Sequence, residues 1–201
     1  SGTFFDLSAP GRRDGVLHAV YGGVYGRKNP RVLAPHPATG DLLPVLSHLG
    51  PAAPSGIVMP QNAAVGLRGD LICTEFNTRR LSRHQLSHAG SSFESKVSTF
   101  LESDQTDFHP TDVIEDADGS LLVADTGSWY KICCPTSKIA KPDILGAIYR
   151  LKKKDVAQVE DPRGLALDWK NPQVEWLSDE RPAVVTRAVE CLASEENIES
   201  L

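Results

Sequence analysis

The chain repeats itself at an offset of 50 residues, and this repeat restricts its fold more than any other feature. Four positions recur with the same or a similar side chain: Pro60 and Pro110, Gly69 and Gly119, Leu71 and Leu121, Glu75 and Asp125. Each copy predicts an apolar strand, a glycine turn and a second apolar strand that ends on an acid, with a third strand further on. A repeat of about 40–50 residues built from short strands is typical of a β-propeller blade. We therefore expect a mainly β chain that forms a partial β-propeller of about three blades.

The charge of the chain argues against a nucleic-acid partner, because proteins that bind phosphate backbones carry a basic field. Its 201 residues have a net charge of −5 and a pI near 5.7. The basic run at residues 150–154 is read as a solvated strand end, with a nucleic-acid patch as the alternative. No apolar run approaches the roughly 20 residues that span a bilayer, so no membrane span is expected. The chain opens as if in the middle of a blade and closes as a helix begins, so we expect a fragment.

The sequence pattern changes after residue 155. Residues 1–155 are strand and turn material, whereas the segment from about 161 has helical spacing. Val184, Val185, Ala188 and Leu192 fall on one face of that helix, and Pro182 stands near its start. We expect a partial propeller at 1–155 and the start of helical repeats at 156–201.

Two loops of the second repeat allow more than one interpretation. Asp118-Gly119 predicts a tight hairpin, while Asp116 with Asp118 allows a calcium loop, although the EF-hand ligand spacing is missing. A long excursion at 129–145 precedes the closing strand, and such excursions usually carry function or bind a partner. In it, the adjacent Cys133 and Cys134 allow a vicinal disulfide, a redox role or plain packing. No CxxCH motif is present, so no haem is expected on this chain.

Six motifs resemble one family in sequence and in order: GGVYG, EFNTRR, FHPTDV, EDADGSLLVADTG, WYKICCPTS and GAIYRL. The chain resembles the propeller of PVC-type haem-binding, membrane-bound-dehydrogenase-like proteins. These are similar in turn to the sorbosone and soluble glucose dehydrogenases that use pyrroloquinoline quinone (PQQ). The resemblance implies a parent propeller of roughly six blades, followed by HEAT-type helical repeats and then by a small cytochrome c domain.

The resemblance also implies a cofactor site, transferred here residue by residue. A basic side chain at the hairpin EFNTRR contacts the quinone in the dehydrogenases; Arg79 is its best equivalent, with Thr78 or Arg80 reached by a one-residue shift. Two arginines of the family correspond to His109 and Thr111, so one cation is weakened and one is lost.

Calcium would be held largely by backbone oxygens of a Gln-Gly-Pro loop in the family. Ser8, Ala9 and Pro10 align with that loop, and Ala9 and Pro10 keep the carbonyl groups that the metal would need. The family's catalytic His lies on an earlier blade that is absent here.

Several side chains have both a chemical and a structural interpretation. His109 is a candidate catalytic base or cofactor contact, or else bonds the backbone of a neighbouring blade. Trp129 and Tyr130 form either a stacking wall for a ring-shaped substrate or the cap of a blade end. Asp112 and Asp125 are expected at opposite ends of adjacent strands, where acids often close loops by accepting backbone N–H groups.

Two functions remain open from the sequence. The leading hypothesis is a fragment of an extracytoplasmic, periplasmic or cell-surface, quinoprotein-like dehydrogenase. It would act on a sugar or polyol with PQQ and calcium, and pass electrons to a cytochrome c domain outside this chain. The alternative is a non-enzymatic propeller and HEAT scaffold that binds carbohydrate or protein, favoured by the loss of an arginine at Thr111.

Overall fold

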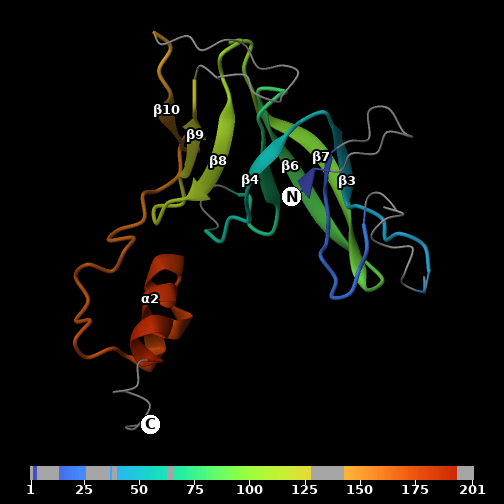
Figure 1. Cartoon of the computed structure of the whole chain (residues 1–201). Coiled ribbons are helices and arrows are strands. Elements are labelled where there is room, and N and C mark those ends of the chain that lie inside the picture. The colour runs from blue at the N-terminus through green and yellow to red at the C-terminus, as the bar shows by residue number, and fades with distance from the viewer. Residues whose placement is uncertain are drawn as a thin grey trace.

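The computed structural model describes residues 2–3, 14–25, 37, 40–62, 66–127 and 143–193. Within these residues the chain is mainly β, with three small antiparallel sheets and one α-helix (Figure 1). The prediction of a mainly β fold is confirmed. The propeller ring itself stays a prediction.

The strands follow one another along the chain, and each pairs mostly with its neighbour in sequence. The first sheet has the order β1-β2-β3 and comprises Gly2–Thr3, Asp14–Val16 and Ser47–Gly50. The second has the order β4-β5-β6-β7 and comprises Pro54–Val58, Leu71–Glu75, Arg80–Ala89 and Ser92–Glu102. The third has the order β10-β9-β8, with β8 at Pro110–Glu115, β9 at Leu121–Asp125 and β10 at Ala147–Leu151.

The 50-residue repeat is confirmed for the second strand of each unit and wrong for the first. Leu71–Glu75 and Leu121–Asp125 are both strands, and the glycines before them have φ angles of +85° and +76°. However, it is Pro54 that pairs with Glu75, as Pro110 pairs with Asp125, so Pro60 is not the counterpart of Pro110. The connection between β4 and β5 is longer than the one between β8 and β9, and this shifts the offset of the first strand.

The two units share their register as well as their strand order. Ile57 pairs with Cys73 in the second sheet, and Val113 pairs with Val123 at the corresponding place in the third. Both first strands also carry a register irregularity near their starting proline. A repeated irregularity of this kind marks two copies of one supersecondary unit.

Apolar clusters join the sheets in sequence. The larger cluster draws on the second and third sheets: Leu67, Ile72, Leu81, Phe108, Val113, Leu121 and Val123. A smaller cluster joins the first sheet to the second through Val16, Leu49, Ala52 and Cys73. The first strands β4 and β8 approach so closely that a Cβ added at Gly56 would lie 2.6 Å from the Cα atom of Asp112. Burial of these apolar faces is what holds the sheets together.

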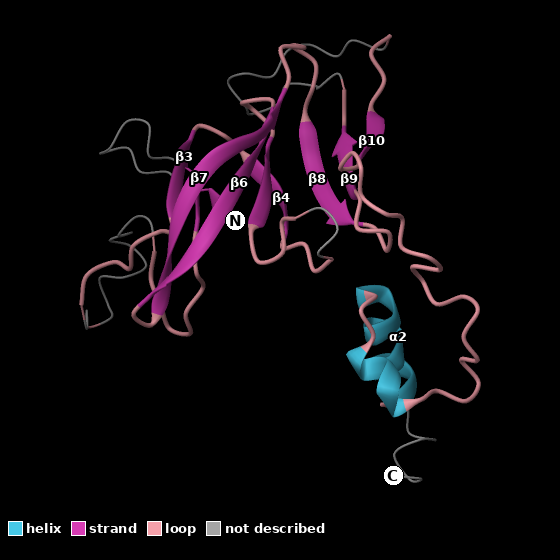
Figure 2. Cartoon of the chain, turned by 180° about the vertical axis from the view of Figure 1, so that it is seen from behind, coloured by secondary structure: helices cyan, strands magenta, loops and turns pink. Residues whose placement is uncertain are grey.

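The C-terminal segment forms a small unit of its own, apart from the strands in Figures 1 and 2. Helix α2 spans Pro182–Leu192 and follows the 3₁₀ helix η2 at Val174–Ser178. Pro182 lies at the helix start, and Val184 and Ala188 are fully buried, as the helical spacing predicts. No helix among the described residues has the length and apolar character needed to cross a membrane. A HEAT-like repeat stays a prediction.

Two half-buried tryptophans link the parts of this small unit. The Trp169 indole N–H donates to the Gly164 carbonyl at 2.6 Å, and the Trp169 and Trp176 rings meet edge to face at 4.8 Å. The Arg187 guanidinium lies 4.3 Å from the centre of the Trp169 ring. The indole thus links the 161–169 turn to η2 and to α2.

Candidate functional site

Glu75 closes the hairpin between β5 and β6. Its carboxylate is fully buried and accepts hydrogen bonds from the Thr78 hydroxyl at 2.7 Å and from Arg80 Nε at 2.6 Å. A second Arg80 nitrogen, Nη2, donates to the other carboxylate oxygen at 3.2 Å. Because a buried charge is costly unless it is paired, this fork contact is what permits an acid at the end of β5. Thr78 and Arg80, the alternatives to Arg79 for the quinone contact, are therefore both bound to Glu75.

Asp125 holds the equivalent place at the end of β9 but has different partners. Its Oδ1 accepts the backbone N–H groups of His109 at 2.8 Å and of Gly127 at 2.9 Å. Asp112 pairs with Ala124, so it lies at the same end of the strands as Asp125. The prediction that these two acids occupy opposite ends is wrong, because antiparallel strands place the start of β8 beside the end of β9.

His109 is fixed by two contacts. Its Nδ1 lies 2.6 Å from the Gly127 carbonyl oxygen, and its ring stacks on that of Phe76 with 4.6 Å between centroids. A carbonyl can only accept, so Nδ1 donates, and in the neutral ring the lone pair is on Nε2. Nε2 has no hydrogen-bond partner among the residues that the structure describes. The ring is half-buried and lies between the two repeated units.

Arg79 and Thr111 are less suited to an anionic cofactor than the resemblance implies. Arg79 adopts a left-handed φ of +57°, and its Nη1 reaches the Asp104 carbonyl oxygen at 3.5 Å. The Thr111 hydroxyl donates to the Ala124 carbonyl at 3.3 Å. Thr111 therefore offers no cation to an anionic quinone, whereas Arg79 keeps its positive charge.

Other predicted site residues lie outside the described part of the chain: Ala9 and Pro10 of the calcium loop, Trp129 and Tyr130 of the stacking wall, and the pair Cys133 and Cys134. In the described part, no three His, Cys, Asp or Glu side chains converge as metal ligands would. The residues that flank the undescribed excursion, Gly127 and Leu145, lie in close contact. A Cβ added at Gly127 would lie 2.6 Å from the Leu145 carbonyl carbon.

A groove opens where the excursion leaves and re-enters the sheet, between the end of β7 and strands β9 and β10. It has a volume of about 540 Å³, and Asp125, Ile144 and Leu145 form part of its lining. Glu102 and Asp107 add two more carboxylates from the other wall. The described part of its lining thus carries three carboxylates and no Lys or Arg, so these described walls are acidic.

Two aromatic rings complete the groove. The Phe108 and Tyr149 rings meet edge to face at 6.0 Å, and Tyr149 is 46% exposed. The sequence pointed to this region through Asp125, the excursion and the motifs FHPTDV and GAIYRL, which contain Phe108 and Tyr149. Glu102 and Asp107 lie in no motif, and only the packing of distant strands brings them beside these rings.

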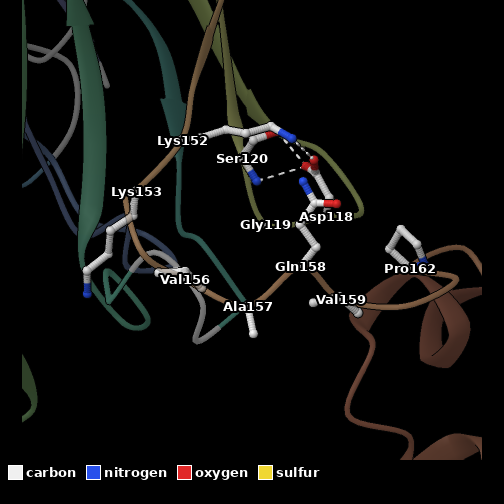
Figure 3. A pocket seen from close by; sticks show the side chains of 10 residues that line it. All are labelled: Asp118, Gly119, Ser120, Lys152, Lys153, Val156, Ala157, Gln158, Val159 and Pro162. Carbon is white, nitrogen blue, oxygen red and sulfur yellow. Dashed lines mark hydrogen bonds and ion pairs between the residues drawn. The ribbon is translucent and has the colours of Figure 1, made fainter.

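The acidic turn between β8 and β9 is a hairpin and not a calcium loop. The Gly119 N–H donates to the Asp116 carbonyl at 2.8 Å, closing the turn as Asp118-Gly119 predicts. Lys152 Nζ lies 2.8 Å from Asp118 Oδ2, and the Ser120 hydroxyl donates a hydrogen bond to Asp118 Oδ1 (Figure 3). Hydrogen bonds from Lys152 and Ser120 hold the pKa of Asp118 well below its usual value. Asp116 is paired with Arg150 at 2.7 Å.

The basic run at 150–154 therefore has a structural use within the fold. Arg150 and Lys152 neutralise the acidic turn, and Arg163 from the C-terminal segment also pairs with Asp116. Hydrogen bonds from Arg150, and then from the Ala117 N–H and Arg163, lower the pKa of Asp116. The turn is thus a junction between the third sheet and the segment that leads to α2.

No family model matches this chain, and neither the curated proteins nor the solved structures contain a match. Function is therefore inferred from the groove and the side chains around it.

Proposed function

We propose that this chain is part of a propeller-type repeat protein that binds a neutral sugar or polyol in the groove between β7 and β10. The lining of the groove carries this proposal: the carboxylates of Glu102, Asp107 and Asp125 stand beside the rings of Phe108 and Tyr149. Carboxylates accept hydrogen bonds from ligand hydroxyls, and an aromatic ring packs against the apolar side of a sugar. The same carboxylates repel an anionic ligand.

The propeller part of the proposal is supported by the way the units repeat. Both have the same register, and their first strands β4 and β8 lie against each other at Gly56. Propeller blades likewise set their first strands around a common axis. In this proposal residues 1–155 are adjacent blades, and residues 156–201 begin a HEAT-like region.

Titration with neutral hexoses and hexitols, followed by calorimetry and by ligand-observed NMR, tests the binding. Glu102→Gln should weaken binding about tenfold, because it removes a charged hydrogen-bond acceptor. Tyr149→Ala should weaken it to a similar extent through the lost ring contact. Glu94→Gln is the matched control, since Glu94 lies on the same strand β7 but does not line the groove. Absence of binding, or equal affinities for Glu102→Gln and Glu94→Gln, would refute the proposal.

A second candidate function is the dehydrogenase that the resemblance implies, and the geometry of His109 favours it. Its ring is held by the Gly127 carbonyl and by Phe76, so Nε2 has the orientation and the lone pair of a base. In this proposal the protein is extracytoplasmic and passes electrons to a cytochrome c domain outside this chain. A shift of PQQ absorbance on addition of protein and calcium, lost in Arg79→Ala and His109→Ala, would support it. Sugar binding without any PQQ shift would leave only the scaffold.

A further inference from the structure

Strand β7 forms a long edge of the second sheet. It spans Ser92–Glu102, eleven residues, and among the described strands it pairs with β6 alone. Strand β5 has five residues and pairs with residues 80–84 of β6, so the longer β6–β7 ribbon extends beyond it. In the described part of the chain no strand pairs with the outer side of β7. Such an edge offers unpaired N–H and C=O groups to another strand.

The turn at Gly90 and Ser91 determines which backbone groups face outward. Ala89 pairs with Ser92 across this two-residue turn, and Gly90 has a φ of +61°. In such a hairpin the flanking pair is hydrogen-bonded, and hydrogen-bonded and non-hydrogen-bonded pairs then alternate along the strands. Residues with even numbers from Ser92 to Ser98 therefore bond to β6. The odd-numbered residues point their N–H and C=O groups outward: Phe93, Ser95 and Val97.

The exposed charges of this edge are one acid and one base, two residues apart. Glu94 and Lys96 are both exposed and lie on the same face of the strand. Neither has an ion-pair partner within the described residues. The other residues from 92 to 99 are uncharged. A pair spaced in this way is complementary to its own copy in antiparallel orientation.

We propose that two copies of this chain associate by pairing their β7 strands antiparallel, about a two-fold axis at Ser95. In this register Glu94 lies opposite Lys96 of the second copy, and the same pair forms a second time through the symmetry. Phe93 lies opposite Val97 of the second copy. Ser95 meets itself with outward-pointing backbone groups, so the alternation of hydrogen bonds is obeyed, and Glu94 and Lys96 face each other in the closer, non-hydrogen-bonded pairs.

The charges select this register from its neighbours. A two-fold axis at Lys96 would place this lysine opposite itself, with like charges in contact. An axis at Val97 would place Glu94 opposite Phe100 and Lys96 opposite Ser98, and would leave both charges unpaired. An isologous contact of this kind closes on itself as a dimer and does not propagate into a fibre.

Charge reversal tests the proposal on the full chain by sedimentation velocity at low salt. The unchanged chain should dimerise, and Glu94→Lys and Lys96→Glu should each raise the dimer Kd about tenfold or more, because each creates two like-charge pairs. The double variant should regain the original Kd. An equimolar mixture of the two single variants should form the mixed dimer, in which every pair is again opposite in charge.

A cysteine probe tests the register directly. Ser95→Cys should form an intermolecular disulfide on mild oxidation, because Cα atoms of a hydrogen-bonded antiparallel pair lie about 5.5 Å apart, within disulfide reach. Ser98→Cys is the control, since Ser98 would face Ser92 of the second copy. A chain that stays monomeric would overturn the proposal. So would a dimer whose Kd is unchanged by every charge variant, or one that crosslinks equally through both cysteines.

Discussion

The contact between the two repeated units can be tested at a single glycine, Gly56 on β4. A Cβ at this position would lie 2.6 Å from the Cα atom of Asp112 and 2.8 Å from the backbone nitrogen of Val113. Real Cβ atoms do not approach other atoms this closely, and both neighbours are backbone atoms of β8, which yield only if the whole strand shifts. Overpacking of this kind costs about 1–3 kcal/mol, and a rigid neighbour places Gly56→Ala near the upper end. With a urea m-value of about 2 kcal/mol/M, the unfolding midpoint should fall by about 1–1.5 M.

Gly40→Ala is the matched control in the same urea titration, followed by circular dichroism. An added Cβ at Gly40 meets no atom within 4 Å, so its midpoint should stay within about 0.3 M of the unchanged chain. If Gly56→Ala unfolds at the same urea concentration as Gly40→Ala, then β4 and β8 do not touch as described. The proposal that the units are adjacent blades would then lose its main support.

Three further outcomes follow from buried or stacked groups. Burial lowers the pKa of His84 below 6.5, so as the pH falls the unfolded chain binds a proton at this histidine before the folded chain does. The unfolding free energy should therefore decline below pH 6.5, and less so in His84→Gln, as urea titrations on both sides of that pH will show. Burial and the nearby Glu75 raise the pKa of the Cys73 thiol to about 12. Iodoacetamide should therefore leave Cys73 unmodified in the folded protein and alkylate it in urea, as peptide mass spectrometry will show. Rapid labelling without urea would contradict its burial. Arg187→Ala should destabilise the α2 unit by about 0.5–1 kcal/mol and change the Trp169 fluorescence, because it removes the cation over that ring. Arg187→Lys should keep part of the interaction. An unchanged unfolding curve and spectrum in Arg187→Ala would count against the contact between Arg187 and Trp169.

The strands that the sequence predicted well are those whose turns carry a local signal. Gly69 and Gly119 both adopt the positive φ that a glycine turn requires, and an acid ends the five-residue strand in both units. Matching Pro60 with Pro110 was wrong because a proline is equally common in a turn and at the edge of a strand. The true counterpart, Pro54, is recognised only from its pairing with Glu75 across the sheet.

The candidate site was harder to predict, since its residues come from strands that are distant in sequence. The sequence singled out Asp125 and His109, which the structure links through a backbone hydrogen bond. It gave no signal for Glu102, because an exposed acid at a strand end is common on protein surfaces, and it marked Tyr149 only as a member of the GAIYRL motif. Their proximity depends on the packing of the second sheet against the third, which no local pattern encodes.

The length of the loop after the second strand explains why the acid that ends this strand is ion-paired in one repeated unit and lines a groove in the other. Glu75 and Asp125 end the same strand of the repeat, but Glu75 is followed after four residues by Arg80, which pairs with it across the hairpin. After Asp125 the chain inserts residues 126–146, and the residue that returns opposite it is Ala147. Since alanine and not arginine stands opposite it, Asp125 bonds to the backbone of His109 and Gly127 and lines the groove. The same repeat position is thus an ion pair across a tight hairpin in the first unit and part of a groove lining in the second, where a long excursion stands in place of the hairpin.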